Sequence, residues 1–451
     1  MEPIIEKIKQ THALLKSQNR EAESINMLKS ICIECIDMLG WCYMDDNDPQ
    51  TAEKIASAGL MIDPSNWLLH NQMCNVKSRL GDIENGLNHA KKSLAYCTAI
   101  SPEVIFNAGV LSHDLGRYKE SEAFYRACLQ VNPNYNIAKF NLGCSLLIQN
   151  KYVEGWPFYE KRFETRQAMK DFRKPYDVAP VWQGEDISGK NLLIFNEQGM
   201  GDLIQNARFL HDLKEMGAKT HLCINNSLIE LFKKSKIPHE SIFGYISDIP
   251  KNIDYILSVN SIPCVLKKEY EKSLYGKKYI SVKTKAKLPN KGKFNVGIIT
   301  CGTHSHPYDW RRSLKNSDIL NLLTTPDVKF YNLTKMDKRV RKKLTKFIDI
   351  KDVELPMDDV SDQLNTFLDT ASFINSLDLI ITVDTSVAHL AGAMGKPTWI
   401  ILDYSNDWRW GAISETTFWY PSARLFRQSY GEEMKSVVDR IKEELIKSTN
   451  S

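Results

Sequence analysis

The sequence predicts an α + α/β protein in which a helical repeat array is followed by two α/β halves, each built on a parallel sheet. Small and turn residues recur about every 34 residues in the first third of the chain. From about residue 175, short β-branched runs alternate with helical segments, and the alternation restarts at Phe294 after a lysine-rich stretch. The first pattern is typical of stacked helix pairs, and the second of parallel sheets covered by helices.

Composition narrows the class of protein. With 451 residues, 43% of them hydrophobic and 25% charged, the chain suits two or three folded domains and is not a mainly disordered protein. The 59 basic and 55 acidic residues nearly balance, so charge gives no reason to expect nucleic acid. Ten irregularly spaced cysteines favour reduced thiols over a disulfide framework. We see no signal peptide and no apolar run near the roughly 20 residues that span a bilayer, and we expect a cytoplasmic protein.

The repeats occupy residues 1–170. Leu39-Gly40, Ala108-Gly109 and Leu142-Gly143 are separated by 69 and 34 residues, about two periods and one. This spacing resembles the tetratricopeptide repeat, with units near 33–66, 67–101, 102–135 and 136–169. The resemblance implies a concave groove that holds a peptide or protein; the alternative is that the helices only dimerise the protein or cap a neighbouring domain. We interpret the pair Cys32 and Cys35, on a repeat helix, as core packing.

The two α/β halves are expected at 175–290 and 291–451. Helical stretches such as Leu203–Met216 and Val387–Met394 separate the predicted strands. These strands are Asn191–Asn196, Thr220–Ile224, Ile253–Val259, Phe294–Thr300, Lys329–Leu333, Leu379–Val383 and Thr398–Leu402. The stretch 267–293 holds ten lysines and is read as an exposed linker, the alternative being contact with an acidic partner or a membrane surface. Ligands are expected in the cleft at the carboxyl ends of the strands.

The first candidate site follows the first predicted strand, at Asn196–Asp202. Gly199 and Gly201 allow the backbone to pass close to a ligand, and the helix that follows offers free N–H groups. Asp202, at the helix start, is placed to take a proton from an attacking hydroxyl. The alternative is that Asp202 merely caps the helix.

The second candidate site is the strand-to-helix turn within Ile380–Ala393. Asp384 ends a buried strand, and Thr385 and Ser386 begin a helix whose free N–H groups favour an anion such as a diphosphate. His389 lies one turn further on and is a candidate phosphate donor, although a lone histidine is more often a satisfied core residue.

Two further segments carry candidate residues. The turn Cys301–Ser313 brings His304, His306, Arg311 and Arg312 to a strand end, which suits a phosphate or a sugar nucleotide. Its alternative is a solvated loop with zinc at the histidines, for which no third ligand has suitable spacing. The aromatic segments Asp407–Trp410 and Trp419–Gln428 suit either sugar stacking or a buried aromatic cluster.

Taken together, these segments resemble glycosyltransferases of the GT-B fold, which has two Rossmann-like halves. The motif Glu-Gln-Gly-x-Gly-Asp-x-Ile-Gln stands at Glu197–Gln205, Asp-Thr-x-x-Ala-His-Leu-Ala-Gly-Ala-x-Gly-Lys-Pro at Asp384–Pro397, and the aromatic ending at Trp419–Gln428. The pattern is similar to bacterial proteins that join tetratricopeptide repeats to a domain like glycosyltransferase family nine, the ADP-heptose lipopolysaccharide heptosyltransferases.

This resemblance implies inverting transfer of a sugar from a nucleotide donor, without metal or cofactor. It implies Asp202 as the base, Asp384, Thr385, Ser386 and His389 around the donor nucleotide, and His306, Asp309 and Arg312 in the neighbouring loop, where Arg312 neutralises the leaving diphosphate. Cys301 and Thr303-His304 depart from the pattern and leave the donor open.

The predicted function is therefore glycosyl transfer, with a nucleotide sugar as donor and Ser or Thr of a protein, such as a flagellin or another surface protein, docked on the repeats. The alternatives are transfer to a saccharide in lipopolysaccharide synthesis, and a repeat scaffold whose GT-B part no longer does chemistry. A homodimer formed through the repeats also stays open.

Overall fold

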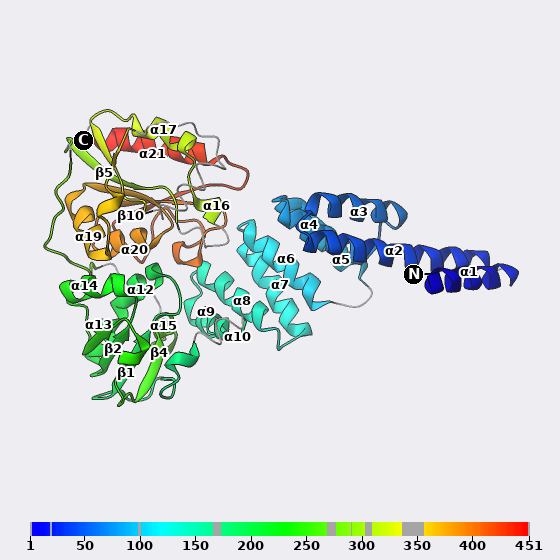
Figure 1. Ribbon diagram of the computed structural model, residues 1–451, viewed down its shortest axis with the longest axis horizontal. Coiled ribbons are helices and arrows are strands. Elements are labelled where there is room, and N and C mark those ends of the chain that lie inside the picture. Colours follow the sequence, from blue (N-terminus) through cyan, green and yellow to red (C-terminus); the bar gives the residue numbers. More distant parts are fainter. Residues whose placement is uncertain are drawn as a thin grey trace. The chain divides into compact units, whose positions relative to one another are not determined.

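A computed structural model describes residues 2–18, 20–97, 101–165, 173–267, 277–289, 291–302, 309–335 and 356–449 of the protein (Figure 1). The chain forms two compact units, Met1–Ser145 and Leu146–Ser451. The described strands all belong to the second unit. No helix within these ranges is both long and apolar enough to cross a membrane.

The first unit is an array of helix pairs. Its helices are α1 (Glu2–Ser17), α2 (Glu21–Asp45), α3 (Pro49–Ile62), α4 (Trp67–Arg79), α5 (Ile83–Tyr96), α6 (Pro102–Asp114) and α7 (Tyr118–Val131), followed by α8 (Asn136–Ile148), which ends in the second unit. α4, α6 and α8 begin where the predicted units begin, at or within one residue of 67, 102 and 136. α2 instead begins twelve residues before the predicted start at 33, and α1 was not predicted.

The period of the array is set by its turns. Residues with left-handed backbone connect the two helices of each pair, at Asn47 (φ 59°), Gly81 (φ 79°), Gly116 (φ 70°) and Asn150 (φ 64°). Their spacings of 34, 35 and 34 residues follow from these positions. Glycine and asparagine are the residues that tolerate this conformation best. Asparagine takes the place of glycine in the first and last of these turns.

Small residues let paired helices approach, as expected. A Cβ at Gly109 of α6 would lie 2.6 Å from the ring of Tyr125 on α7. Ser121 donates to the Gly109 carbonyl at 2.8 Å, and Cys128 is buried. The prediction that Cys32 and Cys35 pack in the core is wrong, because both are exposed on α2. None of the ten cysteines, all of which lie in the described ranges, forms a disulfide.

The second unit holds two parallel sheets. The first contains β1 (Asn191–Phe195), β2 (Lys219–Cys223), β3 (Ser241–Phe243) and β4 (Tyr255–Ser258), in the order β3-β2-β1-β4. The second contains β5 (Phe294–Ile299), β6 (Val328–Asn332), β7 (Asp358–Asp359), β8 (Leu379–Val383), β9 (Thr398–Leu402) and β10 (Ala423–Arg427), in the order β10-β9-β8-β5-β6-β7. In both sheets the chain starts centrally, moves to one edge and returns to the other side, as in a Rossmann fold.

The predicted fold class is confirmed: a helical repeat array precedes two Rossmann-like α/β halves, the composition of a GT-B fold. All seven predicted strands are present within two residues of their expected ends. The strands β3, β7 and β10 were not predicted, because two are very short and the third lies in the aromatic ending.

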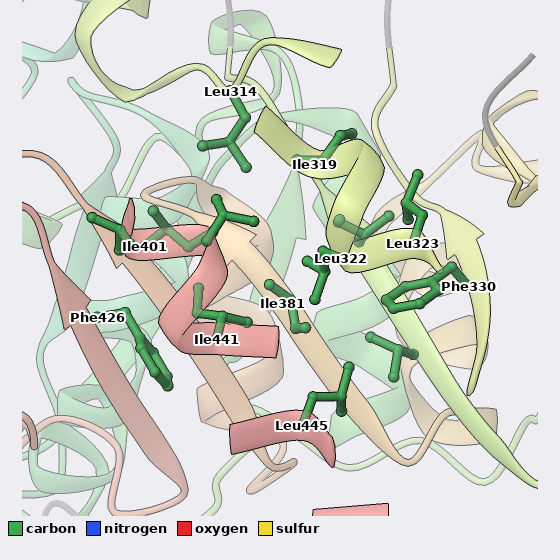
Figure 2. Packing of buried hydrophobic residues seen from close by; sticks show 14 of the residues in the cluster. Leu314, Ile319, Leu322, Leu323, Phe330, Ile381, Ile401, Phe426, Ile441 and Leu445 are labelled. Atoms are coloured by element: carbon green, nitrogen blue, oxygen red, sulfur yellow. The ribbon is translucent and has the colours of Figure 1, made fainter. Parts of the chain in front are cut away.

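Helices cover both faces of the second sheet. On one face, α17 (Asn316–Leu323) and α21 (Met434–Thr449) bury Ile319, Leu322, Ile441 and Leu445 against the strands (Figure 2). On the other face lie α19 (Phe367–Ser376) and α20 (Ser386–Ala393) (Figure 1). These two helices contact α14 (Asn226–Ser235) and α12 (Met200–Asn206) of the first half, so the two sheets are joined through their helices. The remaining helices that bear on the site are α9 (Tyr152–Tyr159), α10 (Arg162–Thr165), α13 (Leu210–Glu215), α15 (Ile262–Val265) and α16 (Asp309–Arg312).

The structural boundaries differ from those drawn on the sequence. The repeats were expected to end at 170, but the compact units divide after Ser145. The rings of Trp156 and Tyr159 on α9 pack on Trp408, at centroid distances of 5.4 and 5.7 Å, which attaches α9 to the α/β part. The boundary at 290/291 also shifts, since residues 279–286 already bond to α19 and α20 of the second half. The described lysines of 277–293 are exposed.

Candidate functional site

A crevice is expected where β5 and β8 lie side by side, because the chain leaves these two strands toward opposite sides of the sheet. Arg312 of α16 lies at their carboxyl ends. Its Nη1 donates to the carbonyl of Asp384 at 2.7 Å, and its Nε donates to the Asp309 carboxylate at 3.0 Å. A Cβ at Gly302, three residues after β5, would lie 2.2 Å from Arg312 Nη2, so a side chain there would displace the guanidinium. The structure thus brings Arg312 to Asp384, as the predicted site requires.

Thr385 and Ser386 open helix α20 at the same edge. Thr385 has extended backbone (φ −146°, ψ 171°), and its hydroxyl makes no cap bond to the helix. The hydroxyl lies 3.2 Å from that of Thr382. The first N–H groups of α20 have no partner inside the helix, as at every helix start, and favour an anion there.

Asp384 introduces a negative charge that the crevice partly offsets. Burial, together with the nearby Asp407, raises the pKa of Asp384 to about 6, while Arg312 acts in the opposite direction. An anion bound here would lie near the guanidinium of Arg312, the first N–H groups of α20 and the carboxyl of Asp384, whose raised pKa makes it a weaker acid than a free aspartate.

Asp202 lies in the first turn of α12, after β1. Its carboxylate pairs with the guanidinium of Arg409, from the second half of the α/β unit. Arg409 is itself buried, and it also donates to Gln205 at 2.8 Å and to Asp407 at 2.7 Å. Burial raises the pKa of Asp202, and Arg409 opposes that shift. Asp202 is therefore a stronger base than a free aspartate, but one engaged by a cation.

Gly201 serves the contact between α12 and α20. A Cβ at this position would lie 2.8 Å from Cδ2 of His389 and 3.3 Å from Cα of Ser386. A side chain would therefore push the two helices apart. Gly199, which was predicted to contact a ligand, has ordinary extended backbone (φ −68°, ψ 166°) before α12. That either glycine touches a ligand stays a prediction.

His389 is enclosed between the halves. Its Nδ1 lies 2.9 Å from the hydroxyl of Tyr420, and its ring stacks on Trp410 at 4.9 Å. Burial, with Arg409 and Arg208 nearby, lowers the pKa of His389 well below its usual value, so the ring is neutral. His389 therefore packs between aromatic side chains. Because Nδ1 already contacts Tyr420, the predicted hydrogen bond to a phosphate would have to come from Nε2.

The aromatic segments form a buried cluster around this histidine. Trp408, Trp410, Trp419 and Tyr420 are all buried, as one of the two sequence interpretations held. Trp310 of α16 instead has 69% of its surface exposed beside the crevice.

A buried ion pair missed by the sequence analysis supports the Asp202 loop. Glu197 follows β1, and its closed-off carboxylate accepts from Nε of Arg162 at 3.0 Å and from Asn260 at 3.1 Å. Asn260 accepts from Asn206 at 2.7 Å, and Asn206 donates to the carbonyl of Asp202 at 3.0 Å. Polar contacts thus run without a gap from α10 to the backbone of Asp202. No motif or spacing in the sequence pointed to Arg162. Arg409 lies in the segment Asp407–Trp410, which was considered only for its tryptophans.

His304 and His306 lie outside the described residues, as does the rest of 303–308. Cys301, which departs from the family pattern, is buried, and this raises the pKa of its thiol to about 11. Within the described ranges, no group of three or more His, Cys, Asp or Glu side chains is placed to hold a metal ion.

Residues 102–135 match the family model of the tetratricopeptide repeat. This is the third unit predicted from the sequence, with the same bounds.

Other similarities cover more of the chain. Protein FlbA of Caulobacter vibrioides is 24% identical over an aligned length of 437, and the match covers 88% of this chain and 70% of FlbA. A glycosyl transferase family 9 structure from Veillonella parvula is 11% identical, with a TM-score of 0.41, over 60% of this chain and 98% of the other. A mutant O-GlcNAc transferase of Thermobaculum terrenum is 10% identical, with a TM-score of 0.31, over 93% and 94%. The chain is thus similar both to tetratricopeptide-repeat proteins and to glycosyltransferases.

Proposed function

We propose that the protein transfers a sugar from a nucleotide-sugar donor to a hydroxyl group of an acceptor. The observation that carries the proposal is that Arg312 and the start of α20 meet at the carboxyl ends of β5 and β8, the switch point of a Rossmann-like sheet. A diphosphate carries the negative charge that this pair of features favours. The nucleotide would lie on the second half, and the acceptor on the side of Asp202.

In the proposed reaction, Asp202 takes the proton of the acceptor hydroxyl. The acceptor oxygen forms a bond to the anomeric carbon of the sugar as the bond from that carbon to the phosphate oxygen breaks. A nucleoside diphosphate leaves with the bonding electrons. Arg312 and the first N–H groups of α20 stabilise the charge that develops on it, a task for fixed donors where no cation takes part. A single displacement of this kind inverts the anomeric centre.

The pair between Asp202 and Arg409 sets a condition on this mechanism. A carboxylate paired with a guanidinium accepts a proton poorly. The Arg409 guanidinium must therefore move away from Asp202, or pair with another anion, before Asp202 acts as a base. The donor's diphosphate is such an anion. Donor binding would then free the base, and transfer would follow donor binding in order.

The proposed acceptor is Ser or Thr of a protein held in the repeat groove. The tetratricopeptide match at residues 102–135 supports a protein-binding array, because stacked repeats expose a concave surface. Transfer to a free saccharide would not need this surface. Removing the helices α1–α7 therefore separates the two acceptors, since only protein modification should be lost.

The Asp202–Arg409 pair also favours a second candidate, a repeat scaffold that binds a nucleotide without turnover. Asp202→Asn distinguishes the two. An enzyme loses transfer while its nucleotide affinity stays, whereas a scaffold keeps its partner binding unchanged.

The first experiment is a thermal-shift screen of the full chain with ADP, UDP, GDP, CDP and CMP. A nucleotide at 100 times its Kd adds about 2.7 kcal/mol of stability, enough to separate the bases. Arg312→Met and Ser386→Trp should remove the shift. The control is Arg424→Met, because Arg424 pairs with Glu444 away from the crevice. If none of the nucleotides or their sugar conjugates shifts the wild-type protein, the proposed donor site is refuted.

A further inference from the structure

An exposed apolar seam runs along helix α2, which has 25 residues. The seam consists of Ile25, Leu28, Cys32, Cys35, Leu39 and Cys42, and all six are exposed. Ile25 and Leu39 keep 52% and 48% of their surface exposed. The steps of three, four, three, four and three residues are the a and d positions of a heptad pattern, the spacing by which one helix packs against another.

The other side of α2 is already used within the array, where Ile33, Gly40 and Met44 are buried and α2 contacts α3 and α4. Ser24, one turn before Leu28 on the seam's own side, is buried as well, because His12 of α1 contacts it. A helix that is apolar on opposite sides is normally enclosed by neighbours. Helix α1 reaches only the start of the seam, at Ser24, and all six seam residues stay exposed in the part of the array that the structure describes, so the seam is open to an occupant.

The seam is complementary to itself when reversed. Its residue numbers pair to a constant sum: 25 with 42, 28 with 39, and 32 with 35. We propose that the seam of α2 binds α2 of a second copy of this chain, antiparallel and about a two-fold axis between residues 33 and 34. Ile25 then faces Cys42 of the partner, Leu28 faces Leu39, and Cys32 faces Cys35.

Charge favours a copy over a foreign peptide. The seam carries no ionised group, and the charged residues of α2 between Ile25 and Cys42 are Lys29, Glu34 and Asp37, all outside it. A charged segment lying here would lose its hydration without gaining a counter-charge, whereas the reversed copy brings only apolar side chains. The pairing would also bury Cys32 and Cys35, which are exposed in the single chain.

The first test is the mass of the full-length protein in solution, by light scattering over a micromolar concentration series. We expect a dimer, with L28K or L39E each raising the dissociation constant by at least about tenfold. The combined variant should recover dimerisation, because the two introduced charges then oppose each other across the pair. V131E, at an exposed apolar position on α7, is the control and should stay dimeric. A wild-type protein that is monomeric throughout overturns the proposal.

The second test fixes the orientation by copper-phenanthroline oxidation in a C42S background. Antiparallel pairing predicts a covalent dimer that forms through Cys32 and Cys35, and that C32S and C35S each suppress. A parallel pair would place Cys32 against Cys32, so C35S would still cross-link. If C35S in the C42S background cross-links with the same yield as C42S alone, the antiparallel arrangement is overturned. It is also overturned if the variant with both L28K and L39E does not recover dimerisation.

Discussion

Replacing Arg162 by methionine tests whether helix α10 holds the loop of the candidate base. Arg162 keeps 2% of its side chain exposed and Glu197 keeps none, and the Nη2 and Nε atoms of Arg162 lie 2.9 and 3.0 Å from the same carboxylate oxygen. Removing one partner of a buried pair leaves an uncompensated charge and costs about 3–5 kcal/mol. Because Glu197 would retain Asn260 and Ser258 as donors, we expect the lower end, about 3 kcal/mol.

Urea unfolding followed by tryptophan fluorescence measures this loss, because seven of the nine tryptophans belong to the unit Leu146–Ser451. Glu197→Gln should also destabilise this unit. The double variant should lose less than the sum of the two single losses, by about 1–3 kcal/mol, because the charges are removed together. Arg424→Met breaks a half-exposed pair and should change little. A loss below about 1 kcal/mol for Arg162→Met would refute the idea that a buried ion pair fixes this loop.

Three further predictions concern packing and pH. Gly201→Ala should cost about 1–3 kcal/mol in thermal unfolding, since its Cβ meets a histidine ring held by Tyr420, whereas Gly199→Ala should be mild because its nearest neighbour is the Asp202 carboxylate at 3.1 Å. Gly109→Ala should destabilise the repeat unit by a similar amount, about 1–3 kcal/mol, measured from the unfolding of the full chain by circular dichroism, and an unchanged unfolding curve would contradict the close approach to Tyr125. Asp384 has a pKa raised to about 6, so the folded state binds its proton more tightly than the unfolded chain does, and stability should fall as pH rises from about 4 to 6. Asp384→Asn should flatten that fall, and an unaltered pH dependence would speak against the shift.

Local patterns in the sequence were enough for the fold. The seven predicted strands are short, mainly apolar runs, several of them rich in β-branched residues, and the repeat starts follow from turns and small residues spaced by one period. Both signals lie within a few neighbouring residues, where side-chain alternation and allowed φ angles act. The same reasoning placed Asp202 and Asp384 at strand ends, because parallel strands that start helices carry their ligands there.

The partners of those residues came only from the folded chain. Arg409 stands 207 positions from Asp202, and no spacing rule connects them; the pair exists because α12 packs on α20. Burial of His389 has the same origin, since Tyr420 and Trp410 reach it from later segments. Arg162 was assigned to the repeats and proved to anchor Glu197. Periodicity fixes which face of an element is apolar, but which distant charge meets a carboxylate depends on how the elements pack, and that packing also sets the pKa of each buried group.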